Sequence, residues 1–185
     1  MSATYPLRWL TADEIPAWRE HVAATYRTAF APPPYLRTER NVQEFLVSFE
    51  THQREPGFQF LGAFAGTPPQ LVGFAYVRRA LPGQWWYSAV APPLRQAGLG
   101  FWLEDSYQLV ELAVHLGYQR RGIGTRLIEA AADGQSALYL HVNRENQQAI
   151  GFYEKVGFVR QSEAAIRLRG RMVGEYLMVR RIETP

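Results

Sequence analysis

The chain has 185 residues, of which 47% are hydrophobic and 14% aromatic, so it is long enough for one compact domain with a buried core. Its 20 Lys and Arg residues nearly balance its 17 Asp and Glu residues, and the net charge of +3 comes without a long basic run. Nucleic acid is therefore not an expected partner. The absence of cysteine excludes disulfides, thiolate metal sites and a cysteine nucleophile.

The first ten residues show no basic segment followed by an apolar stretch. No run of about 18 uncharged apolar residues occurs anywhere, which is the length a membrane-spanning helix needs. We therefore expect a cytoplasmic protein without a membrane partner.

Two helices are expected near the N-terminus. A Thr-x-x-Glu capping box at residues 11–14 predicts a helix that runs to about Phe30, where three prolines follow. A similar pattern at residues 41–44 precedes apolar residues at helical spacing, and it predicts a second helix that ends near His52.

The middle of the chain changes to strand patterns. Residues 58–64 alternate and residues 71–77 are almost continuously apolar, which predicts two antiparallel strands. Residues 81–103 mix prolines and glycines with aromatic residues, and this composition predicts an aromatic loop rather than a regular element. A further strand is predicted over Tyr107–Val114.

The last third alternates between helix and strand. A helix is predicted from near Gly122 to residues 133–134, a strand over Ala137–Val142, and a helix over Asn146–Val156. Two final strands are expected to join around residues 169–171. The strand, helix and strand between residues 107 and 142 read as a parallel crossover unit.

The start of the helix near residue 122 combines glycine with positive charge. The first turn of a helix has unpaired backbone amides and the positive end of the helix dipole, so anions bind there. Gly122 and Gly124 let a phosphate approach the backbone, while Gln119, Arg120 and Arg121 supply donors or charge. The stretch therefore predicts a pyrophosphate site, and close packing of the helix on a strand is the alternative reason for the glycine pair.

The stretch ELAVHLGYQRRGIGTRLIEAA, followed by LHVNRENQQAIGFYEKVGF, resembles the GNAT superfamily of acetyl-coenzyme A dependent N-acetyltransferases. The resemblance implies an α+β fold with a central mixed, mostly antiparallel sheet of about six to seven strands. This sheet is splayed between its two central parallel strands, and helices flank it. It also implies a single domain over residues 1–185 with a motif core at 107–158. Leu116 stands where the family commonly has proline, which affects the stiffness of the loop.

In such enzymes the glycine-containing loop holds the pyrophosphate of acetyl-coenzyme A, which acts as co-substrate, and no metal is expected. The resemblance implies that the pantetheine arm pairs with the strand backbone and lies between this strand and the one at 137–142. The implied cofactor-binding residues are Leu112, Ala113, Val114, Gln119, Arg120, Arg121, Gly122, Ile123, Gly124, Thr125 and Asn146. Simple N-capping of the following helix is the alternative role of Asn146.

Two residues are the candidates for proton transfer. The resemblance implies that Tyr153 protonates the leaving thiolate, and packing beside Phe152 is the alternative. Glu111 is the candidate base, because a carboxylate in an otherwise apolar strand can accept an amine proton, and pairing with an arginine is the alternative. His115 is interpreted as a solvated loop residue, and His141 stays ambiguous.

The acceptor site is less defined by the sequence. Trp85 and Trp86, with Glu104 and Asp105 nearby in the chain, suit a cation or a ring-bearing amine, although they can also simply bury one side of a loop. The predicted substrate-binding residues are Tyr35, Trp85, Trp86 and Glu111.

These observations predict transfer of an acetyl group to a primary amine of a small molecule, with a peptide amine as a variant. An acyl-coenzyme A binding module without turnover is the alternative. A homodimer formed through the C-terminal strands is also expected from the resemblance.

Overall fold

The computed structural model describes residues 4–96, 98–103, 106–168 and 171–182. The chain divides into two compact units. Unit 1 comprises Met1–Arg78 and Val110–Ala131, and unit 2 comprises Arg79–Leu109 and Ala132–Pro185.

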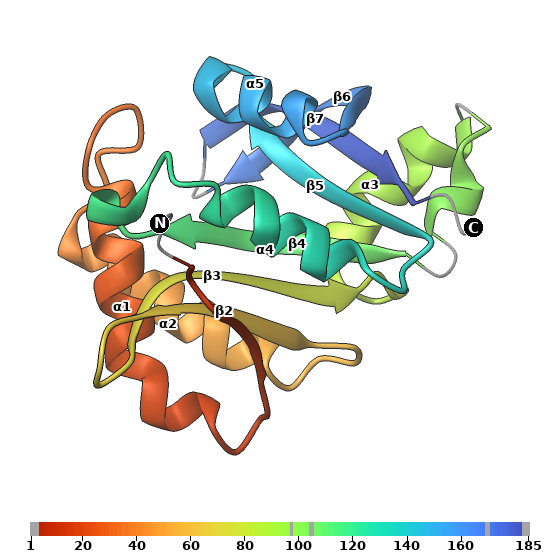
Figure 1. The fold of residues 1–185 in the computed structure, drawn as a ribbon. Coiled ribbons are helices and arrows are strands. Elements are labelled where there is room, and N and C mark those ends of the chain that lie inside the picture. Colours follow the sequence, from red (N-terminus) through yellow and green to blue (C-terminus); the bar gives the residue numbers. More distant parts are fainter. Residues whose placement is uncertain (1–3, 97, 104–105, 169–170, 183–185) are drawn as a thin grey trace. The chain divides into compact units, whose positions relative to one another are not determined.

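Seven strands form one mixed sheet with the hydrogen-bonded order β1-β2-β3-β4-β5-β7-β6 (Figure 1). The strands are β1 (Leu7–Leu10), β2 (Gln59–Ala65), β3 (Gln70–Arg79), β4 (Tyr107–Val114), β5 (Ala137–Asn143), β6 (Val159–Leu168) and β7 (Arg171–Arg181). The start of β4 pairs in parallel with β5, at Tyr107↔Leu138 and Gln108↔Tyr139. The pairs β1–β2, β2–β3, β5–β7 and β7–β6 are antiparallel. The predicted mixed, mostly antiparallel sheet is confirmed, and its splaying stays a prediction.

The helices fall between these strands. They are α1 (Ile15–Phe30), α2 (Glu39–His52), α3 (Trp85–Gln96), α4 (Ile123–Ala132) and α5 (Gln147–Lys155), with short 3-10 turns η1 (Gly100–Leu103) and η2 (Leu116–Tyr118). The predicted helices near 11–30, 41–52, 122–133 and 146–156 are confirmed as α1, α2, α4 and α5, and the predicted strands are confirmed as β2 to β7.

The aromatic core of unit 1 lies where α1 and α2 pack on β2 and β3. Phe49 of α2 is buried, and its ring centroid lies 5.5 Å from that of Phe60 and 5.3 Å from that of Tyr76. Phe45 stacks on Tyr26 of α1 with centroids 3.9 Å apart. Because side chains alternate across a strand, the opposite face of β3 at Gly73 is left for α4.

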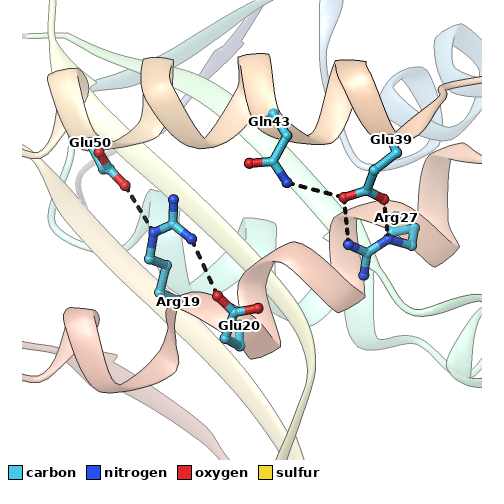
Figure 2. Close-up of polar contacts among 6 residues, drawn as sticks. All are labelled: Arg19, Glu20, Arg27, Glu39, Gln43 and Glu50. Carbon is cyan, nitrogen blue, oxygen red and sulfur yellow. Dashed lines mark hydrogen bonds and ion pairs between the residues drawn. The ribbon is translucent and has the colours of Figure 1, made fainter.

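Charged side chains join α1 to α2 (Figure 2). Arg27 donates to both carboxylate oxygens of Glu39 at 2.7 and 2.9 Å, and Arg19 donates to Glu50 at 2.9 Å. The hydrogen bonds from Arg27, followed by the one from Gln43, lower the pKa of Glu39 to about 2. Exposed ion pairs add little stability. The bidentate Arg27–Glu39 pair nevertheless holds the end of α1 next to the start of α2.

Unit 2 has a smaller apolar core. Its sheet is β5, β7 and β6, and α3 and η1 contribute Leu94 and Leu103 to a buried cluster with Tyr139, Leu177 and Val179. The helix α5 is capped at its start by Asn146.

Two local expectations are wrong, and one strand was not predicted. Residues 81–103 are not an irregular loop, because they form α3 and η1. The Gln84 side chain accepts from the Leu81 amide at 2.9 Å and donates to the Arg79 carbonyl at 3.2 Å, which fixes the helix start despite the two prolines inside α3. Burial of apolar residues such as Ala91 and Leu94 outweighs the lost backbone hydrogen bonds.

The other two concern the N-terminal third. The box of the second helix is formed by Thr38 and Asn41, with the Thr38 amide donating to the Asn41 side chain at 3.0 Å, so α2 begins at Glu39. The short strand β1 was not expected, since its four residues show no alternating apolar pattern, and it forms because β2 offers an edge.

Candidate functional site

The turn between β4 and α4 is held by its own side chains. The Gln119 side chain donates through Nε2 to the Val114 carbonyl at 3.0 Å, and the His115 Nδ1 accepts from the Gly117 backbone amide at 3.1 Å. These contacts tie the end of β4 to the residues that precede α4. His115 is therefore a turn residue, which agrees with its interpretation as a loop histidine.

The backbone of this turn is shaped for an anion. Arg120 has φ +62° and Gly122 has φ +78°, while Arg121 between them does not have a positive φ. Such alternation makes successive backbone amides converge on one side. A Cβ at Gly122 would meet nothing within 4 Å, so the backbone there is open. The first amides of α4 follow directly and add the positive end of its dipole.

The predicted phosphate-binding residues differ in what they expose. Arg120, Arg121 and Gly122 are exposed and Thr125 is half-buried, while the Ile123 side chain is buried and leaves only its backbone for a ligand.

The two neighbouring arginines of the turn support it from the protein side. Arg121 donates to the Tyr5 hydroxyl at 2.9 Å and lies over the Tyr118 ring at 5.3 Å, and Arg126 donates to the Tyr5 carbonyl at 2.8 Å. The Arg120 guanidinium makes no hydrogen bond or ion pair within the described part of the chain. The roles of Tyr5 and Arg126 were not predicted, because Tyr5 lies more than a hundred positions away from the turn.

The predicted base lies in the same unit. Glu111 is a half-buried residue of β4, and burial of its carboxyl group raises its pKa to about 8. The charge of Arg37, from the α1–α2 connection, and the Leu112 amide both act in the opposite direction. An ion pair of Glu111 with an arginine, the alternative role, is not found among the described residues.

The α1–α2 connection contains the predicted acceptor residue Tyr35. Its ring packs edge-on against Phe30 with centroids 4.8 Å apart, and 37% of the residue is exposed. The Arg37 amide donates to the Phe30 carbonyl at 2.9 Å, so the connection folds back on the end of α1. Sequence reasoning missed Arg37, since a lone arginine after three prolines carries no pattern.

Unit 2 contains the other candidates. Asn146 is buried at the start of α5, where its Oδ1 accepts from the Ala149 amide at 3.1 Å, so it is the N-cap. Tyr153 is half-buried, with ring centroids 5.4 Å from Phe152 and 5.6 Å from Phe158. The capping and packing alternatives are therefore both observed, and the cofactor and acid roles stay predictions.

The remaining predicted residues differ in where they lie. Trp85 and Trp86 begin α3, but their side chains lie outside the described part of the structure, as do Glu104 and Asp105 entirely. His141 of β5 lies 3.1 Å from Glu175 through Nδ1, which makes it a structural partner of β7. In the described ranges, no three or more His, Asp or Glu residues gather to hold a metal ion.

The structure thus gathers the predicted residues within each unit. Unit 1 holds Glu111 and residues 112–114 of β4 followed by the turn 119–125, and unit 2 holds Asn146 and Tyr153 on one helix. Within the described residues, none of the helices is both long and apolar enough to cross a membrane.

Comparison with known proteins agrees with this arrangement. Residues 101–160 match the acetyltransferase (GNAT) domain model, which covers β4, the turn, α4, β5 and α5. Over this segment, the sequence-based resemblance to the GNAT superfamily is confirmed.

Two characterised relatives match over short segments. Peptidyl-lysine N-acetyltransferase YjaB of Escherichia coli K12 is 36% identical over 69 residues, covering 37% of this chain and 47% of YjaB. Ribosomal protein bS18-alanine N-acetyltransferase of the same strain is 40% identical over 68 residues, covering 34% of this chain and 44% of that protein. The chain therefore matches less than half the length of these relatives.

Solved structures match over nearly the whole chain. The paia N-acetyltransferase of Thermoplasma acidophilum in complex with coenzyme A gives a TM-score of 0.60 at 17% identity, covering 97% of this chain and all of that one. A chimera of the spermidine N-acetyltransferase SpeG of Vibrio cholerae and hSSAT also gives 0.60, at 16% identity and 95% coverage of both chains. This likeness shows a shared fold.

The raised pKa of Glu111 predicts a pH dependence of stability. A carboxyl with a folded-state pKa of about 8 instead of 4.5 keeps a proton that the unfolded chain has lost, so stability falls as pH rises between these values. E111Q removes this slope. Its Tm should therefore be close to that of wild type near the ordinary pKa of 4.5 and exceed it increasingly up to a pH of about 8, as measured by thermal unfolding.

Glu39 provides a control of opposite sign, because its pKa is lowered to about 2. E39Q should lose only a small amount of stability at neutral pH, because the ion pair is exposed, and this loss should vanish as the pH falls through the folded-state pKa. Parallel pH curves for E111Q and wild type would show that the Glu111 carboxyl is not desolvated.

Proposed function

We propose that the chain is an N-acetyltransferase that moves an acetyl group from acetyl-coenzyme A to a primary amine, and that residues 1–185 form one domain for this reaction. The observation that carries the proposal is the turn between β4 and α4, where open backbone at Gly122 and the free end of α4 follow the strand that holds Glu111. Enzymes of this fold are known in complex with coenzyme A, as the Thermoplasma relative shows.

The turn suits the diphosphate of the coenzyme. Backbone amides of residues 122–125 supply donors, and the exposed Arg120 adds charge. The pantetheine arm pairs with backbone groups of residues 112–114, as an added strand would. Gln119 and Arg121 act mainly by holding the turn, since their side chains are engaged with Val114 and Tyr5.

The coenzyme supplies a thioester, and the chain supplies proton transfer. The amine nitrogen bonds to the thioester carbonyl carbon while its proton passes to the Glu111 carboxylate, directly or through water. The carbon–sulfur bond then breaks, and the sulfur takes the proton of the Tyr153 hydroxyl. A base works best when its pKa lies near the working pH, and a pKa of about 8 meets that condition for Glu111.

The acceptor is an amine of a small molecule or of a peptide. The named relatives act on peptidyl-lysine, on alanine of a ribosomal protein and on spermidine, which share an amine and little else. Tyr35, Trp85 and Trp86 are proposed to contact the acceptor through their rings. Pairing of two copies through the C-terminal strands is proposed as well.

The purified chain should bind acetyl-coenzyme A and release thiol in the presence of an amine. Calorimetric titration measures the binding, and thiol release against a panel of polyamines, peptides and lysine derivatives measures the turnover. Binding without turnover on any amine would favour the acyl-coenzyme A binding module. Failure to bind would refute the assignment of the turn between β4 and α4.

Two glycines allow a matched test of the turn. G122V places a branched side chain over the proposed diphosphate site and should weaken acetyl-coenzyme A binding by at least about tenfold, or about 1.4 kcal/mol. G134V puts the same residue at φ +72° beyond the other end of α4, where a Cβ also meets nothing within 4 Å. It should cause similar backbone strain and leave binding unchanged, as calorimetry would show. Equal losses in both variants would mean that strain alone weakens binding.

The proposed acid gives a kinetic prediction. Y153F removes the hydroxyl while keeping the ring contacts with Phe152 and Phe158, so affinity for acetyl-coenzyme A should stay and kcat should fall by about 10²–10⁴. Y176F, on a ring of β7 that lies under Arg160, is the control and should leave kcat unchanged. An unchanged kcat in Y153F would exclude the hydroxyl as the proton donor.

A further inference from the structure

A partly buried hydrogen bond joins α2 to β3 in unit 1. The hydroxyl of Tyr76 lies 3.1 Å from Nδ1 of His52, and Tyr76 is 2% exposed. The Tyr76 ring is fixed by Phe49 and Phe58, with centroids 5.3 and 5.6 Å away. No step of the proposed reaction uses this pair.

The strand register places Tyr76 beside the proposed base. Strands β3 and β4 run in opposite directions (Figure 1), and the His115 amide donates to the Val72 carbonyl at 2.9 Å. Continuing this antiparallel ladder sets Tyr76 opposite Glu111, and opposite side chains share a face with Cβ atoms about 4.5–5.5 Å apart. Phe74 and Ala113, the preceding pair in this register, lie in the same core cluster.

The charges around Tyr76 agree with this placement. Burial raises the pKa of Tyr76 far above its usual range, and the nearby charge of Glu111 acts in the same direction. Tyr26 of α1 and Glu55 also raise it, whereas Arg78 of β3 lowers it. The charge of Arg37, in the α1–α2 connection, acts on Glu111 and lowers its pKa. The Tyr76 hydroxyl therefore keeps its proton at neutral pH.

The direction of the hydrogen bond follows from counting donors and acceptors. Burial, followed by the charge of Arg78, lowers the pKa of His52 to about 4 against the opposing effect of Glu55, so the imidazole is neutral. Among the described residues, the Tyr76 hydroxyl has no hydrogen-bond partner other than His52. A buried hydroxyl that accepted from Nδ1 would leave its own hydrogen without an acceptor, so Tyr76 donates and Nδ1 accepts.

We propose that Tyr76 and His52 are positioning residues for Glu111: His52 accepts the hydroxyl proton of Tyr76 and keeps it turned away from the carboxylate. Tyr76 then presents the lone pairs of its hydroxyl oxygen, and not its hydrogen, to the Glu111 carboxylate. This arrangement disfavours the charged carboxylate and so makes Glu111 a stronger base.

The expected change in the pH profile of kcat/KM rests on the proposed function. The expected change in the pKa of Glu111 does not. When Nδ1 is removed, the hydroxyl is free to rotate and donate to the Glu111 carboxylate, directly or through one water. A hydrogen bond to the charged form lowers the pKa of a carboxyl group. The base then becomes weaker although neither of its own atoms has changed.

The test is a double-substitution cycle in the full chain with H52L, Y76F and H52L/Y76F. Leucine fills most of the imidazole volume without offering an acceptor. The pKa of Glu111 is measured by carbon NMR of the labelled carboxyl group, with E111Q to assign the signal, and the pH profile of kcat/KM is measured in parallel. H52L should lower the pKa of Glu111 by about one unit or more, which corresponds to about 1.4 kcal/mol.

The same substitution should have no effect in the Y76F background, because the hydroxyl that rotates is missing. H52N offers an amide oxygen near the position of Nδ1 and should keep the wild-type pKa of Glu111. It also tests the acceptor role if the leucine variant misfolds. An unchanged pKa in H52L, or an equal shift with and without the hydroxyl, would overturn the proposal. A pKa that shifts as expected in a chain that transfers no acetyl group would retain the positioning and reject the proposed function.

Discussion

The close approach of α4 to β3 at Gly73 is the constraint on which the arrangement of unit 1 depends. A Cβ at Gly73 would lie 3.1 Å from Ile123 Cγ2, 3.3 Å from the Ala113 carbonyl and 3.4 Å from Leu127 Cδ1. A side chain at this position would push the helix or the strands apart by a few tenths of an ångström, so glycine allows the closest packing. Because Ile123 is the first residue of α4, the same contact fixes the helix end whose amides face the proposed diphosphate.

The other face of β3 sets the chemistry of Glu111. Alternation along the strand turns Phe74 and Tyr76 toward the aromatic core of α1 and α2, and Glu111 on β4 lies against this apolar side. A carboxylate is costly in such surroundings, and the cost is what raises its pKa to about 8. The protein thus gives up stability as the pH rises toward about 8, and in return the proposed base has a pKa near the working pH.

Much of the fold could be predicted, because amphipathic periods and caps are local. The strand–turn–helix at 107–132 and the capping of α5 by Asn146 follow from short patterns in the chain. Helix α3 could not be predicted, since its start depends on the Gln84 side chain and two prolines lie inside it. At the candidate site, Glu111 was recognised as a lone charge in an apolar strand. Arg37 and the His52–Tyr76 pair were not, because only the tertiary fold brings them near β4.

The pKa of Glu111 also bears on which amines suit the site. An α-amino group with a pKa of about 7.7–8.0 can pass its proton to a carboxylate of pKa about 8 at almost no cost. A lysine side chain at about 10.4 starts more than two units higher, which adds about 3 kcal/mol before any bond to carbon forms. The Arg37 charge near Glu111 offsets part of that cost, because a cation beside an ammonium group lowers its pKa. With Glu111 as the proposed base, the proposed reaction would therefore favour weakly basic amines, and a strongly basic acceptor would require further desolvation of its ammonium group.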